Sequence, residues 1–314
     1  MGECSRCEQC LRRSGGRMSG RLILALDGST GACSVALLEL RVGPDAEARE
    51  PLVCGVRMVH DGRAHARLLL RMADEVLEER GAAPSDLAAV VVGTGPGTFT
   101  GVRVTVAAAR AMALALGIPV VGESTLSALA AMAAAQAGVA SGAGSGGAEG
   151  ASTIVPLIDA RRGQVFYAVY RRAETPEEPV WTRVGDFGVC APGGLTVQLT
   201  GAVGAGTCDA GHMRVIGETS VLASLPAFGE CLVAADAAAE WLVLGQARLE
   251  EPAGVLGGRG LLPWLRAAVG SVRPWTSAGV AAGAPGTPES VVPIYVRAPD
   301  ADLHITKMRD PWGA

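Results

Sequence analysis

Two short clusters in this sequence carry residue types that could bind a phosphate group. In the first, Asp27-Gly28-Ser29-Thr30, backbone N–H groups and hydroxyls could hold phosphate oxygens, with Asp27 near a metal ion. Asp, Gly and Ser are also the usual residues of a hairpin turn, so the cluster alone decides nothing. Asp159 lies in a second turn of similar type, and this equivalence makes both aspartates candidate site residues.

The second cluster is the glycine-rich segment GTGPGTFTGVR at residues 93–103. Glycines allow close backbone approach, and a helix beginning at Thr100 or Gly101 would favour an anion at its N-terminus. The segment has no G-K-[ST], and Pro96 lacks an N–H donor, so it is not a Walker loop. A phosphate cradle and tight packing of helix on strand remain equally compatible with it. The candidate phosphate site comprises Asp27, Ser29, Thr30, Gly95, Gly97, Thr98 and Asp159.

Complete catalytic motifs are absent from the sequence. Its four histidines include His60 and His65, which are five residues apart and do not form HExxH. There is no G-x-S-x-G elbow and no protein-kinase motif set. Near the start of the chain, Cys4, Cys7 and Cys10 form C-x2-C-x2-C without a nearby fourth ligand. We therefore predict neither a metal site nor a catalytic centre, and a disordered leader over residues 1–19.

The composition is that of a soluble protein of more than one domain. The chain has 314 residues, of which 49% are hydrophobic and 18% charged, and the net charge is -4. No uninterrupted apolar run reaches the roughly 20 residues of a membrane span. The negative net charge argues against direct binding of nucleic acid by this chain. Scattered cysteines fit a reducing compartment, so we expect a cytoplasmic protein.

The pattern of elements predicts two α/β lobes. Residues 22–26, 33–40 and 52–59 read as strands, followed by a helix around residues 64–80, a strand at 89–92, a helix at 102–116, a strand at 120–121 and a helix to 137. The order β-β-β-α-β-α-β-α is that of a ribonuclease-H-like half-domain.

A Gly/Ala/Ser stretch marks the predicted boundary between the lobes. We assign residues 20–137 to the first lobe, 138–151 to a linker, 152–290 to a second, degenerate lobe and 291–314 to a tail. Residues 153–158 and 164–170 predict a hairpin like the first one. Residues 231–244 predict a helix, and residues 291–297 a compact terminal segment.

The first two helices are more apolar than one sheet contact requires, above all at residues 102–116, where only Arg103, Thr105 and Arg110 are polar. Either the helices cover each other inside the domain, or they form an association surface. The predicted interface residues are His65, Leu68, Leu69, Met72, Val76, Arg103, Val106, Ala109, Arg110 and Ala113.

Several of these segments resemble the TsaB (YeaZ) family of bacteria. The similarity covers residues 22–137 and includes LILALDGSTGACSVALL and the specific segment GPGTFTGVR; DARRGQVF at 159–166 and PIYVRAPDA at 293–301 also match. Residues 170–285 match poorly, and DGST stands where many members have DTS.

This resemblance implies two ribonuclease-H-like lobes of the actin-like ATPase fold. It further implies a non-catalytic subunit that dimerises through its first two helices with a catalytic TsaD-type paralogue. The complex makes N6-threonylcarbamoyladenosine on tRNA and includes a TsaE-type ATPase. We expect no cofactor in the isolated chain, ATP or ADP only at the interface of the assembled complex, tRNA contact only through partners, and a homodimer as an option when the chain is alone. The alternative is an autonomous ATP-dependent phosphotransferase of the actin/sugar-kinase class using Asp27 and Asp159.

Overall fold

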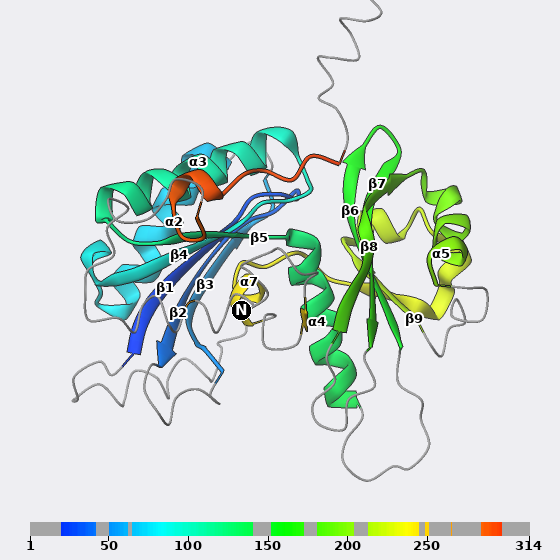
Figure 1. Cartoon of the computed structure of the whole chain (residues 1–314), viewed down its shortest axis with the longest axis horizontal. Coiled ribbons are helices and arrows are strands. Elements are labelled where there is room, and N and C mark those ends of the chain that lie inside the picture. Colours follow the sequence, from blue (N-terminus) through cyan, green and yellow to red (C-terminus); the bar gives the residue numbers. More distant parts are fainter. Residues whose placement is uncertain are drawn as a thin grey trace, which may run out of the picture.

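The computed structural model has two α/β lobes, each built on a mixed β-sheet (Figure 1). It describes residues 20–41, 50–61, 65–140, 152–172, 181–203, 213–244, 249–250, 265 and 284–296. The predicted leader at 1–19, residues 141–151 of the predicted linker and the tail after Val296 lie outside the described residues. Two mixed-sheet lobes confirm the predicted fold class.

The sheet of the first lobe has the strand order β3-β2-β1-β4-β5. Strands β1 (Gly20–Asp27), β2 (Cys33–Arg41) and β3 (Leu52–Val59) are antiparallel neighbours, whereas β4 (Leu87–Gly93) and β5 (Val120–Glu123) run parallel to β1. Residues 22–26 are fully buried because both faces of this central strand are covered. All five predicted strands are confirmed.

Helices α2 (His65–Arg80) and α3 (Phe99–Leu116) pack together on one face of this sheet. A short 3₁₀ turn, η1 (Pro84–Asp86), leads from α2 into β4. Helix α3 begins at Phe99, three residues before the predicted start, and ends where Gly117 adopts a left-handed φ of 65°. By length and composition alone α3 could span a membrane. Its buried side packs on the sheet as in a core helix, so its composition is no argument for a membrane.

Helix α4 (Thr125–Ala140) lies between the two lobes (Figure 1). Its Ala128 packs with the core on the other face of the first sheet, beside α7 (Trp241–Leu244), while Leu126 and Leu129 pack on the second sheet. The helix continues three residues past the predicted boundary at 137, so residues 138–140 are helix and not linker. Alanine is the best helix former, and this Ala-rich sequence carries the helix into the predicted linker.

The sheet of the second lobe has the order β10-β9-β6-β7-β8-β11. Strands β6 (Thr153–Arg161), β7 (Gln164–Arg172) and β8 (Trp181–Cys190) are antiparallel, and β9 (Met213–Gly217) and β10 (Leu232–Ala234) extend the β6 side in parallel. Strand β11 (Leu249–Glu250) pairs with β8. Short helices α5 (Leu195–Val203) and α6 (Thr219–Leu222) contribute to the core on the face away from α4, with the 3₁₀ turns η2 (Pro192–Gly194) and η4 (Pro226–Cys231) beside them in the chain.

The predicted helix over residues 231–244 is wrong. Cys231 ends a 3₁₀ turn, residues 232–234 form β10, and only Trp241–Leu244 is α-helical. Leu232 and Val233 pair in parallel with Val215 and Ile216 of β9. This tertiary pairing overrides the helix propensity of the alanines that follow.

Residues 284–296, which we call the C-terminal strap, connect the two lobes (Figure 1). The strap includes the 3₁₀ turn η8 (Pro288–Ser290) and pairs at Gly286 with Val120. Val291 is buried in the core of the first lobe, and Val296 packs against the core of the second. The strap is therefore extended and not the compact segment predicted.

Candidate functional site

The turn after β1 is built around the buried carboxylate of Asp27. Its Oδ1 accepts the Ser29 N–H at 2.7 Å, and its Oδ2 accepts the Thr125 hydroxyl at 2.7 Å. Thr125 Oγ1 also lies 2.9 Å from Ser29 Oγ. Asp27 is thus held by its own turn and by the first residue of α4.

Burial dominates the electrostatics of this turn. It raises the pKa of Asp27 above its ordinary value, and the hydrogen bonds from Ser29 and Thr125 only partly oppose that shift. Burial and the charge of Asp27 also raise the pKa of the Cys33 thiol to about 12. Cys33 is therefore protonated at neutral pH and is no nucleophile.

The glycine-rich loop presses directly onto the turn. The Thr98 N–H donates to the Ser29 carbonyl at 2.7 Å. A Cβ at Gly97 would overlap that same carbonyl, and a Cβ at Gly93 would overlap the Asp27 carboxylate. The sequence left open a phosphate cradle and tight packing of helix on strand. The contacts at Gly93 and Gly97 are tight packing, but of the loop and a strand end on the turn.

Four backbone donors of the turn and of the glycine-rich loop are engaged within the protein. The N–H groups of Ser29 and Thr98 are bound as described, and the Gly31 N–H donates to Glu218 Oε1 at 3.1 Å. The Thr94 N–H donates to the Glu123 carbonyl at 2.8 Å. This arrangement supports a structural role for the contact between the Asp27 turn and the glycine-rich loop. It gives no support to the phosphotransferase alternative.

Asp159 is not joined to Asp27 by any hydrogen bond or ion pair found among the described residues. It lies in β6, half-exposed, and its Oδ1 accepts the Arg161 N–H at 2.7 Å while its Oδ2 pairs with the Arg161 guanidinium at 3.1 Å. The predicted phosphate site therefore divides into one buried group of residues and one separate aspartate. Within the described ranges, no group of three or more His, Cys, Asp or Glu residues could hold a metal ion.

Most of the predicted interface residues face inward, which corrects that prediction. Buried in the core between the helices and the sheet are Leu69, Met72, Val76, Val106, Ala109 and Ala113. Leu68 and Arg110 are half-buried, Arg103 is exposed, and the side chain of His65 lies outside the described part. Most of the apolar width of these helices therefore serves the core, and among the predicted residues Arg103 remains exposed for a partner.

The exposed residues of α3 form a stripe along the helix. Several of them directly follow a buried residue in the sequence. This outer stripe consists of Phe99, Arg103, Ala107, Ala111 and Leu114. Phe99 is 44% exposed and Leu114 70% exposed, and Leu70 of α2 is 51% exposed. The predicted interface did not include Phe99, Leu114 or Leu70. The outer stripe itself repeats every three or four residues, which was a usable signal for Phe99 and Leu114 once the buried stripe was known.

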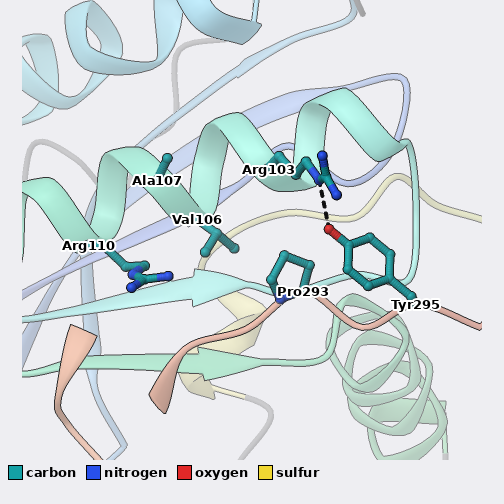
Figure 2. A pocket seen from close by; sticks show the side chains of 6 residues that line it. All are labelled: Arg103, Val106, Ala107, Arg110, Pro293 and Tyr295. Carbon is teal, nitrogen blue, oxygen red and sulfur yellow. Dashed lines mark hydrogen bonds between the residues drawn. The ribbon is translucent and has the colours of Figure 1, made fainter. Parts of the chain in front are cut away.

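Arg103 is fixed at the junction of α3 and the strap (Figure 2). Its Nε donates to the Tyr295 hydroxyl at 2.8 Å, and its guanidinium carbon lies 3.7 Å from the centroid of the Phe99 ring. The rings of Phe99 and Tyr295 are 5.9 Å apart. This cluster borders an open hollow of about 430 Å³ lined by Arg103, Val106, Ala107, Arg110, Pro293 and Tyr295.

Comparisons with known proteins agree with this architecture. Residues 55–180 match the family model described as TsaD, tRNA N6-adenosine threonylcarbamoyltransferase. The chain is 33% identical over 186 residues to the tRNA threonylcarbamoyladenosine biosynthesis protein TsaB of Haemophilus influenzae, covering 58% of this chain and 69% of that protein. This chain belongs to the TsaB family. The identity to TsaB of Escherichia coli K12 is 35% over 153 residues, or 48% of this chain.

The match to the Escherichia coli TsaB spans only 56% of that protein's length. Among solved structures, YeaZ from Pseudomonas aeruginosa superimposes with a TM-score of 0.56 at 26% identity, covering 88% of this chain and 99% of that one. A second structure, of a Pseudomonas aeruginosa protein described as similar to peptidase YeaZ, gives a TM-score of 0.54. The TsaB fold thus extends into the second lobe, where the sequence signal was weakest.

Proposed function

We propose that this chain is a non-catalytic partner subunit of a complex that synthesises N6-threonylcarbamoyladenosine on tRNA. The observation that carries the proposal is its membership of the TsaB family, whose relatives are named for this biosynthesis. In this proposal the catalytic subunit is a TsaD-type paralogue, consistent with the TsaD family model matching residues 55–180 of this chain.

The outer stripe of α3 and Leu70 of α2 form the proposed docking surface. Large exposed side chains such as Leu114 lose contact with water when a partner covers them, and this contributes binding free energy. Arg103 adds a cation already held by Tyr295 and Phe99, so little side-chain entropy is lost on binding. Helix α3 contains no acidic residue, and this favours a partner surface that presents carboxylates.

The other components follow from the same proposal. Because the N–H groups of Ser29 and Gly31 in the Asp27 turn are already engaged, we place ATP or ADP at the interface of the assembled complex and not within this chain. A TsaE-type ATPase is the proposed third subunit, and tRNA is contacted through the partners because this chain has a net charge of -4. We propose a cytoplasmic location and, in the absence of the catalytic subunit, self-association through the same surface.

Co-purification with the TsaD-type subunit of the same organism tests the docking surface. We expect Leu114→Asp to weaken the complex about 30-fold or more, because it buries an unpaired charge in an apolar contact. Val197→Asp is the matched control, since Val197 on α5 is 71% exposed in the second lobe. A charge at Leu69 or Ala109 would be uninformative, because both are core residues and the variant would unfold.

The same variants test the cellular role. In cells depleted of the native chain, the Val197→Asp variant should restore N6-threonylcarbamoyladenosine in tRNA, measured by mass spectrometry of nucleosides, and Leu114→Asp should not. Normal modification levels after depletion would contradict the proposed function. Full complex formation by Leu114→Asp would contradict the docking surface.

A further inference from the structure

Two acidic residues stand at the carboxyl ends of adjacent parallel strands in the second lobe. Glu218 directly follows β9, and Asp236 comes two residues after β10. In open α/β sheets this edge is where ligands usually bind. Here both side chains instead meet residues of the first lobe.

Glu218 contacts the turn that follows Asp27. Its Oε1 accepts the Gly31 N–H at 3.1 Å, a contact between residues 187 positions apart in the chain. The main chain of Glu218 is itself fixed, because its carbonyl accepts the N–H groups of Val221 and Leu222 as α6 begins. The carboxylate is therefore presented to the turn from a rigid position.

Asp236 makes the second contact, at the far side of the first sheet. Its Oδ2 lies 3.8 Å from Nε2 of His60, which follows β3. The loop that carries Asp236 is anchored to the end of β9 in the second sheet, since the Ala235 N–H donates to the Gly217 carbonyl at 2.9 Å. Both side chains are partly exposed, so this contact is the weaker one.

The inner side of the lobes is joined separately by α4. Thr125 binds Asp27 in the first lobe, and Ser127 Oγ lies 2.8 Å from the Tyr170 hydroxyl in the second. The strap and α7 also join the lobes, and the two contacts at the strand ends add to these connections at the edge of the second sheet.

We propose that Glu218 and Asp236 form an acidic clasp that holds the two lobes closed across the edge where related folds would accept a ligand. Glu218 supplies most of the restraint, since a carboxylate bound to a backbone N–H in a partly buried setting is stronger than the exposed contact between Asp236 and His60 at 3.8 Å. The clasp is a property of the free chain and does not depend on the proposed function.

Hydrogen exchange of the free protein tests the clasp. In Glu218→Ala we expect the backbone amides of the peptide spanning residues 28–34 to exchange about tenfold faster, as for loss of one charged hydrogen bond. The double variant Glu218→Ala, Asp236→Ala should also show a larger radius of gyration in small-angle X-ray scattering. Glu218→Gln, which keeps a carbonyl acceptor of the same size, should give a smaller increase in exchange.

Asp186→Ala, which removes an exposed acidic residue of β8, is the matched control and should change neither quantity. Circular dichroism would verify that each variant is folded. If Glu218→Ala does not fold, Glu218→Gln provides the comparison with the control. Exchange in Glu218→Ala or Glu218→Gln equal to that of the control would overturn the clasp. Faster exchange spread equally over all peptides would also overturn it, because that pattern reports general destabilisation.

Discussion

The hairpins β1–β2 and β6–β7 contain the same local structure in two different surroundings. In each, an aspartate accepts the backbone N–H two residues later at 2.7 Å, from Ser29 in one and Arg161 in the other. Asp27 is the last residue of β1, and Asp159 is two residues before the end of β6. Asp27 is buried and its second oxygen binds Thr125, whereas the second oxygen of Asp159 pairs with a largely exposed arginine. Only the first hairpin is covered by the glycine-rich loop.

This difference separates what a turn sequence determines from what its surroundings determine. An aspartate followed by small or flexible residues readily forms the local hydrogen bond in either place. Whether that aspartate becomes a structural centre depends on residues distant in the chain, such as Thr98 and Thr125. The comparison leads to three predictions about stability, beginning with the largest effect.

Replacing one glycine near each hairpin should give the largest difference in stability between the two substitutions. Gly97→Ala places a methyl group on the Ser29 backbone carbonyl, which cannot move without disturbing Asp27, so we expect about 3 kcal/mol of destabilisation or more. Gly163→Ala at the tip of the second hairpin has open space around it and only a left-handed φ of 69° to oppose it, so about 1 kcal/mol is expected. Denaturant unfolding of both variants measures the difference, and equal losses would contradict tight packing of loop on turn.

The sequence was sufficient for elements whose pattern is local. The fully apolar run at 22–26, the helix stop at Gly117 and both hairpins were predictable because period and turn chemistry agree there. The strand at 232–234 was not, since only its pairing with β9 excludes a helix. Likewise, the apolar residues of α3 could not be divided into core and surface until the sheet beneath the helix was known.

The candidate site was predictable in composition but not in arrangement. Asp27, Gly97 and Thr98 were correctly grouped because they surround one strand end. The Arg103 contact with Tyr295 joins residues 192 positions apart, and no local pattern encodes it. Glu218 was also missed, because its contact with Gly31 joins residues 187 positions apart. It also lies in the part of the sequence that matched the family poorly.

Truncation of the two aspartates is the second test. Asp27→Ala leaves the Ser29 N–H and the Thr125 hydroxyl buried without their acceptor, and we expect a loss of about 2 to 3 kcal/mol. Asp159→Ala removes a hydrogen bond and an ion pair from a solvated turn, so about 1 kcal/mol or less should be lost. Thermal or urea unfolding at pH 7 provides the measurement. A larger loss of stability in Asp159→Ala than in Asp27→Ala would contradict the conclusion that Asp27 is the structurally more important aspartate.

The smallest effect concerns the charge of Asp27. Because burial raises its pKa in the folded chain, the folded state holds the proton more tightly than the unfolded state. The stabilising contribution of the protonated form is therefore present below the ordinary value of 3.8 and is lost as pH rises through the raised pKa. At neutral pH the buried charge is a cost.

Asp27→Asn removes that cost and keeps the shape of the side chain. Its carbonyl can accept the Ser29 N–H, while its amide donates to Thr125 Oγ1 and the Thr125 hydroxyl turns toward Ser29 Oγ. We expect the variant to be more stable than the native chain by about 1 kcal/mol or less at pH 7.5, on the order of one hydrogen bond. The advantage should shrink as pH falls through the raised pKa and be smallest below the ordinary value of 3.8, where the native carboxyl is protonated in both states. Asp159→Asn, in solvent, is the control, and urea unfolding across this pH range measures both. If Asp27→Asn were less stable than the native chain, and increasingly so as pH rises, the turn would require the negative charge itself. The first hairpin would then be a charged site and not a turn stabilised by packing.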